Sequence, residues 1–113
     1  MKSYAIEFLE NFRERIIKEC MDIFILAKLS EGIAMSGFDF LVFFHKKFYI
    51  MFSSGTVYSQ LYSLERQELL QGEMVSRKIS YSITEKGQEI IPIILSLNSK
   101  ILALLKDLES SSK

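Results

Sequence analysis

A chain of 113 residues suits a single domain, and its apolar content of 49% excludes an intrinsically disordered protein. The formal net charge is zero, from 14 basic and 14 acidic residues, which weighs against a strongly basic nucleic-acid-binding domain. The single cysteine, Cys20, excludes an intramolecular disulfide, and no stretch supplies the roughly 20 apolar residues of a membrane span, so we expect a cytoplasmic protein.

The first predicted element is a helix over residues 3–29, with Asn11 as a candidate break. Its apolar residues recur at spacings of three and four, which places them on one face. These are Leu9, Phe12, Ile16, Cys20, Ile23 and Ala27. Charged residues fill the other side, so the pattern predicts an amphipathic helix. Gly32 suits the left-handed cap that follows a helix.

Two shorter helices are predicted next, over residues 36–47 and 54–68. Ser36 is the expected N-cap of the first helix, which ends in cations. In the second helix the inner face consists of Val57, Leu61 and Leu64. Its outer face is neutral and rich in hydrogen-bonding groups. Tyr58 and Tyr62 either pack against the domain or stack on a nucleobase.

Two short strands follow, over residues 70–75 and 78–83, with Ser76-Arg77 at the tip of the hairpin. A long helix over residues 84–109 then begins with Thr84-Glu85-Lys86-Gly87 and contains Pro92. Six apolar residues in this helix keep a heptad spacing: Ile90, Ile94, Leu97, Ile101, Leu104 and Leu108. This heptad seam predicts a partner helix in a dimer, with packing on its own domain as the alternative.

The order of elements is that of a winged helix-turn-helix. The expected fold is mainly α with a small β-hairpin (α+β), an N-terminal helix extension and a long C-terminal dimerisation helix. We expect a single domain over residues 1–113. Residues 1–83 form its DNA-binding part, 84–109 its dimerisation helix and 110–113 a disordered tail.

In such a fold the third helix enters the major groove of DNA. Gln60 can pair bidentately with adenine, and serine and threonine hydroxyls can donate or accept. The predicted contacts of this helix are Ser53, Ser54, Thr56, Ser59, Gln60, Ser63 and Arg66. The predicted phosphate contacts are Arg77 and Lys78 in the hairpin, with Lys46 and Lys47 either gripping phosphate or solvating a helix end. Residues 36–83 carry a net charge of only +1, so we expect salt-sensitive binding.

Three stretches of the chain resemble the PadR family of regulators. They are residues 25–32 (ILAKLSEG) followed by Ser36-Gly37-Phe38, residues 55–65 (GTVYSQLYSLE) and residues 81–87 (YSITEKG). The second is similar to the family's recognition-helix signature, and the third resembles its wing-to-helix junction. The resemblance implies a dimeric transcription regulator, often a repressor, whose C-terminal helix forms much of the dimer. Whether the N-terminal helix adds to the dimer contact is left open.

An enzyme is not expected, because the sequence shows no nucleophile–base pair, no metal-binding cluster and no phosphate-cradling glycine loop. No cofactor or metal is expected either, and His45 is interpreted as a solvated helix-end residue. Two other hypotheses stay open. One is a winged helix that binds protein rather than DNA. The other is a sensor of a small-molecule effector, with residues 38–52 and the N-terminal helix bordering a pocket.

Overall fold

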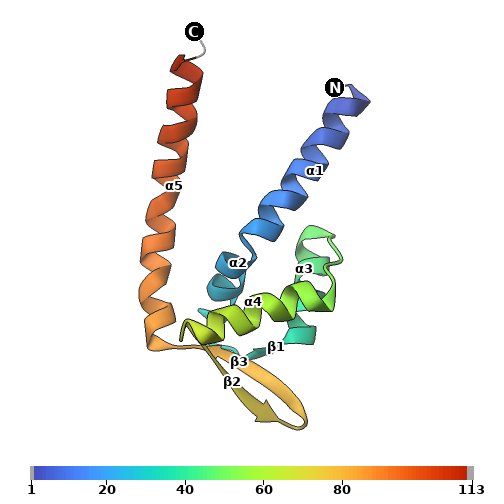
Figure 1. Ribbon diagram of the computed structural model, residues 1–113, viewed down its shortest axis with the longest axis vertical. Coiled ribbons are helices and arrows are strands. Elements are labelled where there is room, and N and C mark those ends of the chain that lie inside the picture. Colours follow the sequence, from blue (N-terminus) through green and yellow to red (C-terminus); the bar gives the residue numbers. More distant parts are fainter. Residues whose placement is uncertain (1, 112–113) are drawn as a thin grey trace.

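The computed structural model describes residues 2–111, apart from the side chains of Asn98, Leu102, Leu105 and residues 108–111. In chain order the elements are α1 (Ser3–Glu19), α2 (Met21–Leu29), β1 (Met35–Ser36), α3 (Gly37–Phe48), α4 (Ser54–Arg66), β2 (Leu70–Val75), β3 (Lys78–Ile83) and α5 (Glu85–Ser111). Helices α2, α3 and α4 form a compact unit. The β2–β3 hairpin, here called the wing, projects from one end of this unit, whereas α1 and α5 extend from the other (Figure 1).

The N-terminal region is not one helix, because it breaks at Cys20. Cys20 leaves helical geometry, with φ −98° and ψ 18°, while its N–H still donates to the Ile16 carbonyl at 2.9 Å. The expected break at Asn11 is therefore wrong. Upstream of the break, the Arg13 guanidinium donates to the Phe48 carbonyl at 3.1 Å and lies 5.7 Å from the Phe48 ring. These contacts hold α1 against the end of α3.

The apolar face predicted for this region is also wrong in its phase. Ile17, Met21, Ile25 and Leu29, spaced by four, are the residues that enter the core, together with Leu26. The predicted face is largely exposed: Leu9, Phe12 and Ile16 are 49%, 46% and 44% exposed, and Ala27 is exposed as well. Apolar residues occupy both faces, and the break at Cys20 selects the second. Leu9, Phe12 and Ile16, named here the α1 stripe, are left without cover.

The hairpin strands have the predicted bounds. They pair antiparallel from Leu70 opposite Ile83 to Val75 opposite Lys78. Ser76 and Arg77 both have left-handed backbone, with φ 49° and 68°, as a two-residue type I′ turn requires. The third strand, β1, was not predicted, because two residues are too short to show an alternating pattern. It pairs with β3 and gives the sheet order β1-β3-β2.

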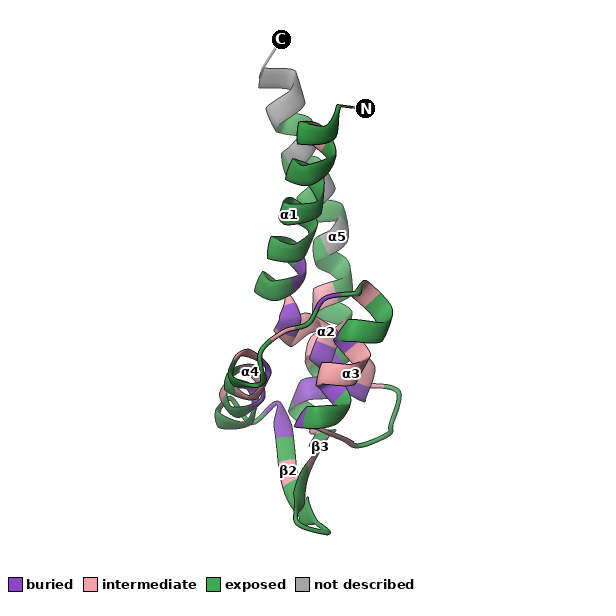
Figure 2. Cartoon of the chain, turned by 90° about the vertical axis from the view of Figure 1, so that its right-hand side faces the viewer, coloured by how far each residue is buried: buried purple, intermediate pink, exposed green. Residues whose placement is uncertain are grey.

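The aromatic segment of residues 38–52 builds the core. Phe40 and Phe44 are completely buried, and Phe43, Phe48 and Phe52 pack around them. The Phe44 ring lies 5.2 Å from that of Phe43 and 5.4 Å from that of Phe52, both in edge-on arrangements. Buried residues gather where α2, α3 and α4 meet, whereas α1 and the wing tip are mostly exposed (Figure 2).

The described side chains of α5 that pack on the domain lie near the start of the helix. Ile90, Ile91 and Ile94 lie against the core, but Leu97, Ile101 and Leu104 are 39%, 55% and 65% exposed. Apart from Ile91, these residues belong to the predicted heptad seam, which is named here the α5 seam. Leu108, its last residue, has a side chain outside the described residues. Ser110 and Ser111 are helical, which corrects the predicted tail, and residues 112–113 lie outside the described part. None of the described helices is long and apolar enough to cross a membrane.

Tyr81 places a phenol hydroxyl in the apolar core. Its side chain is completely buried, and its hydroxyl has no hydrogen-bond partner among the described residues. Burial raises the pKa of Tyr81 above 10.0, and the nearby Glu65 carboxylate adds to the effect. Above pH 10 the unfolded chain therefore ionises this phenol while the folded chain does not, so stability falls as the pH rises, by up to about 1.4 kcal/mol per pH unit.

We expect Tyr81→Phe to leave the free energy of unfolding at pH 7 within about 1 kcal/mol of the wild type, because an unpaired buried hydroxyl contributes little. Between pH 9 and 11 the variant should gain stability relative to the wild type, since it has no phenol to ionise. Urea unfolding across this range measures both values. Parallel stability profiles would show that Tyr81 ionises equally well in the folded chain.

Candidate nucleic-acid interface

Helix α4 presents a polar face to solvent because three apolar residues fix its other side. Val57, Leu61 and Leu64 are buried at helical spacing, as predicted. The Ser53 hydroxyl caps the helix by accepting the Thr56 N–H at 3.2 Å. The face opposite the core carries Gly55, Ser59, Tyr62 and Arg66, all exposed, and Ser54 is exposed at the start of the helix. This face can offer hydroxyls, an aromatic ring and one guanidinium to a ligand.

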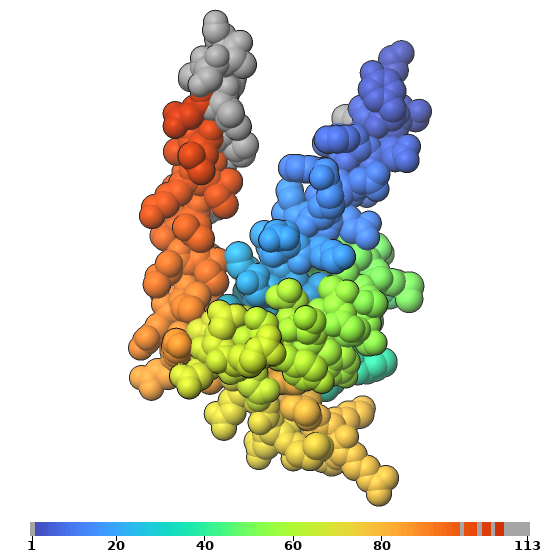
Figure 3. Space-filling view, viewed as in Figure 1, coloured from blue at the N-terminus to red at the C-terminus, as the bar shows by residue number. Residues whose placement is uncertain are grey.

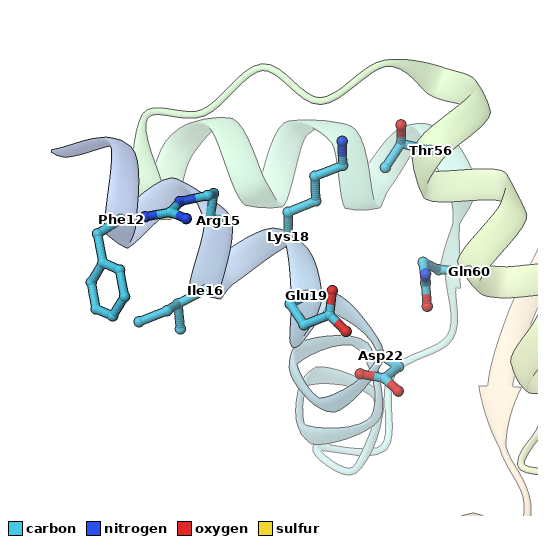
Figure 4. A pocket seen from close by; sticks show the side chains of 8 residues that line it. All are labelled: Phe12, Arg15, Ile16, Lys18, Glu19, Asp22, Thr56 and Gln60. Carbon is cyan, nitrogen blue, oxygen red and sulfur yellow. The ribbon is translucent and has the colours of Figure 1, made fainter. Parts of the chain in front are cut away.

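One edge of this face borders a groove of about 690 Å³ between α4 and the α1–α2 segment. Thr56 and Gln60 are half-buried there, with Lys18, Glu19 and Asp22 on the opposite wall (Figure 4). Phe12, Arg15 and Ile16 complete the lining. The structure thus turns Gln60 toward α2, away from the centre of the exposed face. The groove carries two cations and two anions, so it does not strongly attract either sign of charge.

The other edge of the face borders a groove of about 250 Å³ beside the wing. Its lining comes from β1, α3, α4 and the wing: Ser36, Phe38, Tyr58, Arg77, Lys78 and Ile79. Tyr58 can reach it because its ring lies directly on Gly37, where any Cβ would overlap the ring. The Lys78 ammonium lies 5.9 Å from the centre of the Phe38 ring. We name this the wing groove; it places two cations next to the polar face of α4.

The wing is tied to α4 by a hydrogen bond from its first strand. The Gly72 N–H donates to the Glu65 carboxylate at 3.0 Å. A Cβ at position 72 would crowd both Glu65 and Ile79, so the absence of a side chain allows this close approach. This hydrogen bond therefore links the wing directly to α4, the helix that carries the polar face.

The remaining predicted contacts are placed differently. Lys46 and Lys47 are exposed at the end of α3, and Lys47 lies over the Phe43 ring at 5.8 Å. Lys47 lines a groove between α2 and α3 with Phe24 and Lys28 rather than the wing groove. The Ser63 hydroxyl is within 3.2 Å of the Gln67 side-chain nitrogen, so it already has a partner. The structure brings Arg77 and Lys78 together with Tyr58 of α4 in the wing groove, whereas Lys47 lies in a different groove.

The sequence interpretation missed Ser36, Phe38 and Ile79 as lining residues of the wing groove. For Phe38 a signal was present: it is out of phase with Phe40 and Phe44, the buried pair of α3. A large aromatic residue out of phase with its helix's core positions faces outward, and Phe38 is 58% exposed. No signal in the sequence places Ile79 beside α3, because that contact depends on how the wing folds back.

Three packed helices, the third with a polar outer face, followed by a two-stranded wing define a winged helix-turn-helix protein. This predicted fold is confirmed. The chain superposes on TA0346 of Thermoplasma acidophilum, a protein described as a transcriptional regulator, with a TM-score of 0.68 and 20% identity over 88% of this chain and 97% of that one. It superposes equally well, with a TM-score of 0.68, on a PadR-like transcription factor from Bacteroides fragilis, with 17% identity over 87% of this chain and 98% of that one.

At these identities the likeness establishes the fold alone. The predicted resemblance to PadR-like proteins is therefore confirmed for the fold. No family model matches the sequence, and no curated protein matches it.

Proposed function

We propose that this chain is a homodimeric transcription regulator that binds double-stranded DNA, with α4 in the major groove and the wing on the phosphate backbone. The observation that carries the proposal is the exposed polar face of α4 next to the two cations of the wing groove. The names of both structural neighbours, a transcriptional regulator and a transcription factor, support it. The PadR resemblance implies a repressor, so we propose that the chain represses transcription.

The dimer is supported by two uncovered apolar surfaces on the projecting helices. Leu97, Ile101 and Leu104 of the α5 seam are exposed, and so is the α1 stripe. In the space-filling view α1 and α5 stand apart above the domain and do not cover each other (Figure 3). Soluble monomers seldom expose large contiguous apolar patches, so we propose that a second copy covers these surfaces, with α5 as the main contact and α1 as an additional one.

A protein-binding winged helix is the second candidate, and one surface favours it. A shallow groove of about 270 Å³ lies on the outer side of α3, lined by Phe38, Leu41, Val42, His45, Met51 and Phe52. Phe38 and Met51 are 58% and 83% exposed there. A gel shift with random duplex at low salt separates the candidates. A DNA regulator retards the duplex, because phosphate contacts bind every sequence, whereas a protein-binding module leaves it free.

The contribution of α4 to DNA-sequence preference can be tested by comparing substitutions at two neighbouring residues. Ser59 lies on the exposed face, whereas Gln60, the residue first expected to read adenine, is half-buried toward α2. We expect Ser59→Ala to relax the preference at one base pair in each half-site by on the order of 1 kcal/mol, roughly fivefold. Gln60→Ala should leave the preferred site unchanged.

Selection of bound duplexes by each variant measures these preferences position by position. Non-specific affinity serves as the control, since neither substitution removes a phosphate-binding cation. If Gln60→Ala relaxed the site and Ser59→Ala did not, the face of α4 that meets DNA would be the one next to α2.

A further inference from the structure

Helix α5 begins against the turn that joins α4 (Ser54–Arg66) to β2, and three successive carbonyls of this turn mark the contact. The Lys86 ammonium donates to the Gln67 carbonyl at 2.9 Å. The Thr84 hydroxyl donates to the Glu68 carbonyl at 2.7 Å, and the Thr84 N–H donates to the Leu69 carbonyl at 3.1 Å. Backbone carbonyls need a hydrogen-bond partner, so these donors satisfy groups of the turn that would otherwise need water.

The same residues also start α5. The Gly87 N–H donates to the Thr84 hydroxyl at 3.0 Å, so Thr84 caps α5 while it holds the turn after α4. Gly87 packs so closely on the Leu69 carbonyl that a Cβ there would overlap it. We call this set of contacts, from Thr84, Lys86 and Gly87 to Gln67, Glu68 and Leu69, the α4–α5 junction. The junction contains the Thr84-Glu85-Lys86-Gly87 motif, which is not part of the proposed DNA-binding surface.

The junction joins the start of α5 to the turn that follows α4, so it bears on the angle between these two helices. Beyond Ile94, the last residue that packs on the core, the 17 residues up to Ser111 extend about 25 Å from the domain at 1.5 Å per residue. A tilt of this projecting part by about 8° therefore moves its far end by roughly 3.5 Å, about the rise of one base pair. In a dimer joined through α5, such a tilt changes the separation of the two α4 helices.

We propose that the α4–α5 junction sets which spacing between DNA half-sites the dimer accepts, with Thr84 and Lys86 as positioning residues. The inference rests on the proposed function, because it requires a DNA-binding dimer joined through α5. Neither residue needs to contact DNA. Both act by fixing the direction in which α4 faces relative to the dimer helix.

The test compares Lys86→Met and Thr84→Val with the wild type on duplexes that carry two selected half-sites at spacings from two base pairs short to two base pairs long. The wild type should prefer one spacing by about tenfold, because DNA must be twisted or bent to fit another. In both variants this preference should fall below about threefold, while affinity for a single half-site stays within about twofold of the wild type. Lys86→Arg and Thr84→Ser, which retain the donors, should restore the preference.

Lys100→Met is the matched control, because it removes an exposed ammonium from α5 away from the junction. Light scattering and urea unfolding confirm that each variant is a folded dimer. A folded, dimeric Lys86→Met or Thr84→Val with the wild-type spacing preference would overturn the inference, as would an equal loss of single-site and double-site binding. If the wild type binds no duplex, the proposed function itself fails, and this is seen before any variant is compared.

Discussion

Leu97→Glu combined with Leu104→Glu should convert the protein from a dimer into a monomer. The two residues are 39% and 65% exposed on the same side of α5, and in a dimer their side chains would meet a second helix. A carboxylate without a partner is strongly disfavoured in such an interface. Light scattering should report half the wild-type mass. Because two linked sites bind more tightly by about 10²–10⁴, affinity for a two-half-site duplex should fall by a factor in that range.

The control places the same charges on the other side of the helix. Leu95 and Ser99 are exposed and lie roughly opposite the α5 seam at 100° per residue. Leu95→Glu combined with Ser99→Glu should leave the mass and the DNA affinity close to wild type. A soluble, stable dimer from the seam variant would exclude the α5 seam as the dimer contact and leave the α1 stripe as the alternative.

Arg77→Ala combined with Lys78→Ala should weaken binding to every duplex and make it less sensitive to salt. Arg77 forms the tip of the wing and Lys78 follows it, and both line the wing groove. Each phosphate contact contributes about −0.9 to the slope of log K against log salt, so up to four contacts from two wings contribute about 3–4 units. When the salt concentration rises from 50 to 200 mM, the affinity of the wild type should therefore fall roughly 100-fold more than the affinity of the variant.

Salt titration on specific and random duplexes measures this slope. The loss should be equal on both, because phosphate contacts carry no sequence information. Lys2→Ala combined with Lys106→Ala removes two exposed cations outside the wing and should keep the wild-type slope. An unchanged slope in the wing variant would place the wing away from DNA and favour the protein-binding candidate.

Local signals in the sequence were sufficient for the two hairpin strands and for the starts of α3, α4 and α5. The hairpin strands were predicted to the residue, because alternation and two flanking breaks define them. The N-cap at Ser36 was likewise predicted, and the structure adds its reciprocal bond, from the Ser36 N–H to the Asp39 carboxylate at 2.9 Å. Each of these features depends on residues within a few positions of one another.

Features that depend on distant contacts could not be predicted. The break at Cys20 lies inside a continuous apolar pattern, and only the packing of Met21 and Ile25 against the core selects it over Asn11. For the same reason, the sequence predicted burial for the face of the N-terminal region that is exposed in the structure. In α4 the sequence distinguished inner from outer residues, but the position of α1 and α2 decides that Gln60 lines a groove while Ser59 faces solvent.

Selection of bound duplexes from a random pool tests the central claim most directly, because it assumes neither the operator nor any contact residue. The proposal predicts enrichment of a two-fold symmetric site. Its half-sites should be centred about 34–36 Å apart, one turn of DNA, or a multiple of that distance. A pool that shows no enrichment after repeated rounds at low salt would contradict the assignment of α4 and the wing as a DNA-reading surface.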